Sequence, residues 1–415
     1  MIFKKEDRKE ILEKYAKYVS KGKVDLYTQF GFDLVAGERG GVKLKDIGGR
    51  EFYNVHCNGG VFNLGHRNPE VIAALKEALE YYDIGNHHLI SGPRAILAEK
   101  LVSTFPDPLN KVVYNVGGGE AIDLTIKIAR GYTGRMKIIY ARGGYHGHTG
   151  LALAAGEEKF KKPFLGETPD FIPVEFNNID AVREKCTEEV AAVIFETVPA
   201  TGGIKIPSPD FFPEVKRICS EKGAMFIIDE VQTGFGRTGK LWGFEHFDFV
   251  PDIVVIGKGM SGGIYPITAV IYNEEYETIF LQDPFIHIST FGGSELGCHV
   301  AMKVLEISSR KEFLDNVNKQ AQIFREGVES VMNEIPGVIT EFRQLGLMMG
   351  LKIKDEMTAL IFLKHLFDNG VYTVYSGNDP SVIQFLPPLI IREDESRDIL
   401  DRIRKTTMSV REITG

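Results

Sequence analysis

The sequence lacks the patterns that mark secreted, membrane-embedded and metal-binding proteins. It has only four cysteines in 415 residues. Their spacing is that of neither a disulfide framework nor a metal site, so we expect reduced thiols and no metal centre. No apolar run approaches the roughly 20 residues of a membrane span, and the charged, helix-like N-terminal stretch has no signal-peptide core. These absences predict a cytoplasmic protein with no membrane partner.

An excess of basic charge is also absent. The chain has 49 basic and 57 acidic side chains, a formal net charge of −8, and the two signs are mixed along its length. Because nucleic-acid binding depends on a basic patch, no nucleic-acid partner is expected. Hydrophobic residues make up 43% and charged residues 26% of the chain. This is the composition of a globular protein, and the length suffices for two or three domain-sized units.

The middle of the chain alternates short apolar runs with amphipathic stretches. Several of the runs are apolar throughout, as is typical of strands covered on both faces. Strands alternating with helical patterns, such as 120–131 and 211–222, predict an α/β fold with a largely parallel sheet. The predicted strands are residues 111–116, 137–141, 171–176, 191–196, 225–230, 252–256 and 268–272.

The two ends of the chain predict a second, smaller α/β unit. Residues 1–55 contain a helical pattern and then a hairpin-like segment at 41–54, with Asp46-Ile-Gly-Gly as its turn. From about residue 310, helical patterns at 311–335 and 357–369 flank short strands, and an amphipathic helix is expected near 393–413. We therefore predict an N-terminal segment (1–55) that packs with a C-terminal small domain (306–415), and a large domain (56–305) between them.

Three segments place chemistry at strand ends, where open α/β sheets bind ligands. One apolar strand ends in Asp229 and Glu230 and runs into a glycine-rich loop that extends to Gly239. Another, at 252–256, is followed by Lys258 among small residues. Three glycines, 117–119, connect a third strand to a helix. Each segment alone has an ordinary alternative, such as a surface lysine, a helix cap or a plain loop, but together they are specific.

The chemistry of pyridoxal phosphate requires a residue or loop of each of these three kinds. The cofactor needs a lysine amine for a Schiff base, and that lysine then moves a proton at the substrate carbon. It needs a carboxylate at the pyridine nitrogen, because a protonated ring withdraws electrons better. Its phosphate needs backbone N–H groups at a helix N-terminus. Lys258, Asp229 and the triple glycine meet these needs, so the sequence predicts a pyridoxal phosphate enzyme.

At these residues the chain resembles the class III aminotransferases, which are pyridoxal phosphate enzymes of fold type I. The similarity covers nearly the whole length, and residues 229–239 form one of its most specific motifs. The order of the motifs is closest to that of the putrescine-type and other ω-aminotransferases. The resemblance implies a mostly parallel seven-stranded sheet in the large domain, and a homodimer with active sites at the interface. The other matching motifs are Gly65-His66-Arg-Asn-Pro69, Tyr145-His146-Gly147, Thr290-Phe-Gly-Gly293 and Pro387-Pro388-Leu389.

The resemblance implies a set of contacts to the cofactor ring. Lys258 carries the cofactor and acts as the proton shuttle, Asp229 pairs with the pyridinium nitrogen, and Gln232 binds the phenolic oxygen. Tyr145 stacks on the ring with support from His146. For these last two residues, an ordinary buried aromatic and a core histidine are the alternatives.

Contacts to the phosphate and the substrate are implied in the same way. Gly118 and Gly119 offer their amides to the phosphate, and Thr290 reaches the phosphate of the partner subunit's cofactor. Glu196 lies near the substrate side of the pocket. Phe62, within the stretch 58–63, lines the donor site.

Departures from the family pattern bear on the substrate. The family usually has Ser-Gly-Thr or Ser-Gly-Ala at 117–119, Glu-Pro-x-x-Gly at 196–200 and Asn-Pro at 294–295, and this chain differs at all three. Many members also have an arginine shortly before the C-terminal Pro-x-Leu, as a fork for the substrate α-carboxylate. Gln384 stands there instead, and an uncharged amide forms no ion pair. We therefore expect a donor without a free carboxylate at that site, unless another arginine has taken over. The candidates are Arg94, Arg142, Arg343 and Arg392, although Arg343 matches a family position whose role is mostly structural and is therefore not assigned to the substrate.

The predicted reaction is a ping-pong transamination. The donor is a diamine, another primary amine or a β-aminoacyl-CoA such as 3-aminobutyryl-CoA, and the acceptor is a keto acid, 2-oxoglutarate. Because 2-oxoglutarate has two carboxylates, a cationic group must receive at least one. Alternatives on the same fold are a racemase, epimerase or aminomutase, and an ornithine- or GABA-type aminotransferase. A cofactor-binding protein without turnover is disfavoured, and so is a dinucleotide-dependent oxidoreductase, because the glycine loop lacks that fingerprint.

Overall fold

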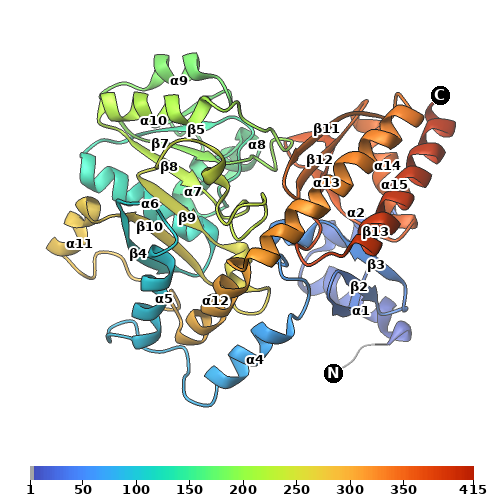
Figure 1. Cartoon of the computed structure of the whole chain (residues 1–415), viewed down its shortest axis with the longest axis horizontal. Coiled ribbons are helices and arrows are strands. Elements are labelled where there is room, and N and C mark those ends of the chain that lie inside the picture. The colour runs from blue at the N-terminus through green and yellow to red at the C-terminus, as the bar shows by residue number, and fades with distance from the viewer. Residues whose placement is uncertain (1–3) are drawn as a thin grey trace.

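A seven-stranded sheet forms the centre of the larger half of the molecule (Figure 1). The computed structural model describes residues 4–415. The strands are β4 (Leu109–Asn115), β5 (Lys137–Ala141), β6 (Phe171–Val174), β7 (Val190–Glu196), β8 (Met225–Asp229), β9 (Ile253–Ile256) and β10 (Thr268–Asn273). They lie in the order β4-β10-β9-β8-β7-β5-β6. β10 is antiparallel to both neighbours, and the other pairs are parallel. Each predicted strand corresponds to one of these, so the predicted α/β class is confirmed.

The strands are apolar on both faces, which is why helices cover both sides of the sheet. Every residue of β7 is buried. Val193 and Phe195 belong to one buried cluster, and Ala192 and Ile194 belong to the other, as expected when successive side chains point to opposite faces. The buried face of α10 (Phe211–Lys222) lies in the first cluster and that of α6 (Gly118–Thr133) in the second. Both helices were predicted from the sequence.

A smaller antiparallel sheet lies in the C-terminal part of the chain. Its order is β11-β12-β15-β14, and the helices beside it appear in orange and red in Figure 1. These helices correspond to the three helical patterns of the C-terminal sequence. The elements are β11 (Ile339–Leu345), β12 (Met348–Ile353), β14 (Val374–Ser376), β15 (Asp379–Phe385), α13 (Lys311–Glu334), α14 (Glu356–Asp368) and α15 (Glu393–Thr414).

The N-terminal segment lies beside this C-terminal region (Figure 1). It contains α1 (Arg8–Tyr18), α2 (Lys21–Gln29), β1 (Ala36–Gly40), β2 (Lys43–Asp46) and β3 (Glu51–Asn54). β2 and β3 form the expected hairpin, in whose turn the Asp46 carboxylate accepts the Arg50 N–H at 2.9 Å. β3 also pairs in parallel with β13 (Val371–Tyr372). β1 and the break between the helices, where the Ser20 side chain caps α2, were not predicted. The division at residues 55 and 305 stays a prediction.

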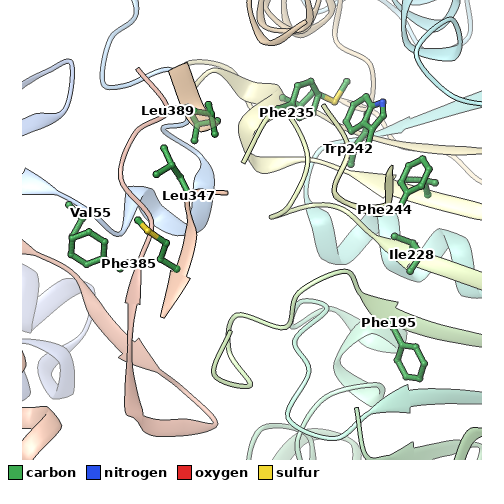
Figure 2. Packing of buried hydrophobic residues seen from close by; sticks show 14 of the residues in the cluster. Val55, Phe195, Ile228, Phe235, Trp242, Phe244, Leu347, Phe385 and Leu389 are labelled. Carbon is green, nitrogen blue, oxygen red and sulfur yellow. The ribbon is translucent and has the colours of Figure 1, made fainter. Parts of the chain in front are cut away.

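One buried cluster connects the N-terminal segment, the smaller sheet and the larger sheet. Figure 2 shows side chains of that cluster from all three parts, namely Val55, Leu347, Phe385, Leu389, Phe195, Ile228, Phe235, Trp242 and Phe244. Within residues 4–415, no helix has the length and the apolar character needed to cross a membrane. The cytoplasmic location stays a prediction.

Shorter elements complete the chain. The remaining helices are α3 (Cys57–Gly60), α4 (Pro69–Ala78), α5 (Gly92–Val102), α7 (Gly150–Ala154), α8 (Glu158–Leu165), α9 (Ile179–Lys185), α11 (Thr278–Gln282) and α12 (Glu295–Ser308). The 3₁₀ turns are η1 (Lys5–Asp7), η2 (Gly243–His246), η3 (Lys258–Ser261) and η4 (Glu274–Glu277).

Candidate active site

Asp229, the last residue of β8, is held by contacts to both carboxylate oxygens. Oδ2 lies 2.9 Å from Nδ1 of the buried His146, and Oδ1 accepts the backbone N–H of Val231 at 3.0 Å. Burial disfavours a charge on His146, but the hydrogen bond and the negative charge of Asp229 outweigh burial and raise the pKa of the imidazole. The carboxylate is thus fixed in one orientation at the carboxyl end of the large sheet.

Lys258 follows β9 and has a strained backbone. Its φ is 41°, in the left-handed region that residues other than glycine rarely adopt. Its Nζ donates to Oε1 of Gln232 at 3.4 Å. Burial lowers the pKa of the ammonium group, although the charges of Asp229 and Glu196 act in the opposite direction. A lower pKa leaves more free amine, which is the form that attacks a carbonyl.

Glu196 ends β7 directly beside Asp229, with which it is paired in the sheet register. Its Oε1 accepts the backbone N–H of Tyr145 at 2.8 Å. Burial raises the pKa of Glu196 to about 7, so this carboxyl carries a proton for part of the time at neutral pH. Tyr145 is 37% exposed, and its stacking on the cofactor ring stays a prediction.

The triple glycine lies at the start of α6. Gly117 is the N-cap residue in an extended conformation and has no side chain to cap the helix, while the Glu120 carboxylate accepts the N–H of Val116 just before it, at 2.9 Å. The first-turn amides of Gly118 and Gly119 therefore remain available for an anion. A Cβ on Gly119 would lie 2.7 Å from Oγ1 of Thr149. The Thr149 hydroxyl therefore explains why the chain has glycine where the family has threonine or alanine.

Thr290 is exposed on the loop between α11 and α12. Its predicted contact needs a second subunit and stays a prediction.

Gln384, which stands where many family members have an arginine, is buried on β15 and is already engaged. Its Nε2 donates to the carbonyl oxygen of Ala200 at 3.3 Å. The same oxygen accepts the hydroxyl of Ser376 at 2.8 Å, and the hydroxyl of Thr373 donates to the backbone oxygen of Gln384. Two departures from the family pattern, Gln384 and the altered stretch 196–200, thus contact each other.

The four arginines considered as replacements are all held by protein acceptors. Arg343 lies near the altered stretch 196–200, since its Nη1 donates to the Gly203 carbonyl at 2.6 Å. Each keeps at least one contact to a protein acceptor, although within residues 4–415 Nη2 of Arg94 is buried without a hydrogen-bond partner. The partners are Gly293 and Asn86 for Arg94, Glu175 for Arg142, Gly203 and Glu341 for Arg343, and Asp394 and Glu395 for Arg392.

The stretch predicted to line the donor site begins with a left-handed turn. Residues 57–60 all have positive φ, between 50° and 99°. Cys57 and Asn58 are not glycines, and each such residue costs roughly 1–2 kcal/mol. Strain of this kind is concentrated at functional sites. The Phe62 ring packs against the His66 ring, with centroids 4.1 Å apart, and against Gly263, so its role at the donor stays a prediction.

Sequence reasoning missed His56, which directly precedes this turn. Burial and the charge of Lys258 lower the pKa of the His56 imidazole to about 4. The Asn-Gly-Gly that follows at 58–60 indicates a turn. However, no linear pattern brings position 56 to position 258, because the two residues meet only through packing.

Comparison with known proteins assigns the family. The family model described as aminotransferase class-III matches residues 28–407. The chain belongs to the class III aminotransferases. It is 50% identical over 406 residues to an uncharacterized aminotransferase of Archaeoglobus fulgidus, covering 98% of this chain and 95% of that relative.

Solved structures of aminotransferases have the same fold. The ornithine aminotransferase from Toxoplasma gondii superposes with a TM-score of 0.90 at 26% identity, covering 98% of this chain and 96% of that chain. The acetylornithine aminotransferase from Elizabethkingia anophelis superposes with a TM-score of 0.80 at 27% identity, covering 95% and 99%. The predictions of fold type I, of an aminotransferase and of pyridoxal phosphate as cofactor are confirmed.

The residues of this aminotransferase fit the cofactor. Lys258 has a lowered ammonium pKa, Asp229 is oriented by His146, and the N-terminus of α6 has unused amides. Nε2 of His146 is buried, and in the part of the chain described here it has no hydrogen-bond partner. A buried polar atom without a partner is unfavourable, as expected of a site built around a further group.

Proposed function

We propose that this class III aminotransferase transfers the amino group of a donor that has no free α-carboxylate at the Gln384 position. A diamine, another primary amine or a β-aminoacyl thioester such as 3-aminobutyryl-CoA fits this description. The observation that carries the proposal is the buried, uncharged Gln384 amide bonded to the Ala200 carbonyl. A carboxylate placed there would be buried without a cation, which is strongly unfavourable.

Five residues would perform the cofactor chemistry. When bound, pyridoxal phosphate supplies an electron-withdrawing ring that lets the substrate carbon lose a proton. Lys258 would hold the cofactor and then move that proton. Asp229, oriented by His146, would keep the ring nitrogen protonated. Tyr145 would cover the ring face. Glu196 accepts the backbone N–H of Tyr145, and because its pKa is raised to about 7, it would add less negative charge beside Asp229 than an ordinary glutamate.

We propose 2-oxoglutarate as the amino acceptor, with an arginine that exchanges a protein contact for a carboxylate of the acceptor. Arg343 is the best placed of the four candidates, because its Gly203 partner belongs to the loop that Gln384 contacts through Ala200. Release of one hydrogen bond there would free guanidinium donors for a carboxylate. Racemases and aminomutases on the same fold release no keto product, so detection of that product separates them from a transaminase.

An ornithine-type activity is the second candidate. It is supported by the likeness to the ornithine aminotransferase of Toxoplasma gondii and the acetylornithine aminotransferase of Elizabethkingia anophelis. Such a donor carries an α-carboxylate. Because Gln384 is uncharged, that carboxylate needs one of the four other arginines as its partner. Ornithine and 1,4-diaminobutane differ by that carboxylate alone, and comparison of the two therefore decides between the candidates.

A homodimer is part of the proposal. Two neighbouring segments, 79–96 and 281–291, expose an apolar surface, and they meet where the His88 and Phe285 rings lie 5.2 Å apart. Exposed patches of this kind mark association sites, and Thr290 lies in the second segment. We expect light scattering to give a dimer. The exposed residues include Leu79, Tyr81, Leu89, Ile90, Ile96, Leu281, Phe285, Ile286, Ile288 and Phe291.

A donor titration followed by visible absorption tests the proposal. The panel contains 1,4-diaminobutane, β-alanine, a β-aminoacyl-CoA, ornithine and alanine. We expect the yellow band to disappear with an amine or thioester donor and to return with 2-oxoglutarate, and we expect Lys258→Ala to lack the band. Gln384→Arg should reduce activity on amines and increase it on α-amino acids. If this variant changes neither activity, the assignment of the donor class is wrong.

A further inference from the structure

The amine of Lys258 lies against a wall of backbone. A Cβ on Gly59 would lie 3.3 Å from Cε and 3.7 Å from Nζ of Lys258, and 3.4 Å from Nε2 of Gln232. Gly59 belongs to the left-handed turn 57–60. A donor whose nitrogen would replace this amine on the cofactor must come close to the turn, and side chains that flank the turn can contact the rest of the donor.

Asn54 fixes the position of His56 at the start of this turn. The buried Oδ1 of Asn54 accepts the backbone N–H groups of His56 and Cys57, at 3.3 and 3.0 Å. The backbone oxygen of His56 accepts the N–H of Gly59 at 2.9 Å. Because the backbone of His56 is held at both its N–H and its C=O, the direction of its Cα–Cβ bond is fixed as well.

The imidazole of His56 is polar but unused. It packs edge-on against the Tyr372 ring, with centroids 6.5 Å apart, and among residues 4–415 neither ring nitrogen makes a hydrogen bond to the protein. Burial and the charge of Lys258 keep the ring uncharged at neutral pH. An uncharged imidazole offers one donor and one acceptor nitrogen and no positive charge.

We propose that His56 is a specificity-determining residue whose uncharged ring accepts a hydrogen bond from the second ammonium group of a diamine donor bound at Lys258. The inference rests on the proposed function, because it needs a donor without an α-carboxylate at Gln384. An ammonium group has three donors and needs acceptors, which the ring supplies. A distal carboxylate would find no cation there, since both His56 and Gln384 are uncharged. Among the proposed donors, the site therefore favours the diamine.

Kinetics with 1,4-diaminobutane and butylamine isolate this contact, because the two donors differ only in the second amino group. We expect the wild-type enzyme to have a higher kcat/KM for the diamine. His56→Leu should reduce the preference for the diamine about 10- to 100-fold, the range expected for a hydrogen bond to a charged group. His56→Gln, which retains an acceptor, should keep most of the preference. His365→Leu, on α14, is the matched histidine control and should change nothing.

Two measurements separate specificity from a structural role. Single-turnover mixing without keto acid gives the apparent dissociation constant of each donor from the concentration dependence of the rate at which the visible band disappears, and the effect of His56→Leu should fall on the diamine alone. The visible band of the bound cofactor should be unchanged in every variant. If His56→Leu does not retain the cofactor, His56→Phe restores a ring without an acceptor and should show the same loss of preference.

The outcomes that overturn the inference differ from those that overturn the proposed function. An equal loss on both amines, an unchanged preference, or a wild-type enzyme with no preference for the diamine would each exclude the role of His56. A wild-type enzyme that uses a β-aminoacyl thioester but neither amine also excludes it and leaves the proposed function standing. Turnover of α-amino acids alone would exclude both.

Discussion

Replacing Asn54 by alanine should release the left-handed turn that lies against Lys258. Asn54 is 3% exposed, and its side chain makes three contacts. Oδ1 accepts two backbone N–H groups, those of His56 and Cys57, and Nδ2 lies 2.9 Å from Nε2 of His66. Asn54→Ala removes all three. Asn54→Asp keeps an oxygen that accepts both N–H groups. His66 can then donate from Nε2 to the second carboxylate oxygen, so this variant serves as the matched control.

The expected loss follows from which partners remain buried. Cys57 and His66 are buried, whereas His56 is partly exposed. Leaving a buried polar group unsatisfied costs about 1–3 kcal/mol, so two such groups give a loss of about 2–6 kcal/mol in Asn54→Ala. Relaxation of the left-handed residues Cys57 and Asn58 to ordinary φ values would release strain and offset part of this loss. Asn54→Asp should lose less than about 1 kcal/mol.

Urea unfolding of the cofactor-loaded enzyme, at one fixed protein concentration, measures both variants. The midpoint should fall in Asn54→Ala with an unchanged slope, and the absorbance of the bound cofactor should change because the wall beside Lys258 has moved. A loss below about 1 kcal/mol in Asn54→Ala, or an equal loss in both variants, would refute the view that this side chain holds the turn.

Three further predictions concern the large sheet and its loops. Burial raises the pKa of Glu230 to about 7, so the folded state binds this proton more tightly than the unfolded state, and stability falls as pH rises from about 4.5 to 7. Glu230→Gln should flatten the pH dependence of the free energy of unfolding in this range, a change of up to about 3 kcal/mol that urea unfolding at several pH values measures. Trp242→Ala should lose about 3–5 kcal/mol in urea unfolding followed by circular dichroism, since Trp242 is fully buried. Gly346→Ala would place a Cβ 2.2 Å from the carbonyl carbon of Thr238 and should lower the melting temperature far more than Gly337→Ala, whose Cβ meets nothing within 4 Å.

The large sheet could be predicted because its signals are local. Each strand is a short apolar run, and burial on both faces leaves no polar alternation that could be mistaken for another structure. The same local character made Asp229 and Lys258 recognisable, because Asp229 ends one buried strand and Lys258 comes two residues after the end of another. By contrast, β1 has the sequence Ala-Gly-Glu-Arg-Gly and is mostly exposed. It forms only because β2 lies beside it.

Contacts between distant residues could not be predicted. The sequence showed that Gln384 replaces an arginine, but its bond to Ala200 joins residues 184 positions apart. Likewise, the glycine at position 119 looked like a lost hydroxyl until the fold placed Thr149 against it. His56 was missed for the same reason. In each case the decisive neighbour is set by packing of the chain, which no local pattern records.

The pairing of β3 with β13 has a consequence for the order in which the protein is made. The guanidinium group of Arg50 donates to the carbonyl of Phe367, 317 residues further along the chain, at 2.7 Å. At a synthesis rate of about 5–20 residues per second, the ribosome needs roughly 15–60 s to add that length. During this interval β3 has an unpaired edge in the nascent polypeptide, a state open to association with other chains. A chaperone could protect this edge, and so could a hairpin that stays unformed until β13 is made. Either form of protection would increase the yield of folded enzyme.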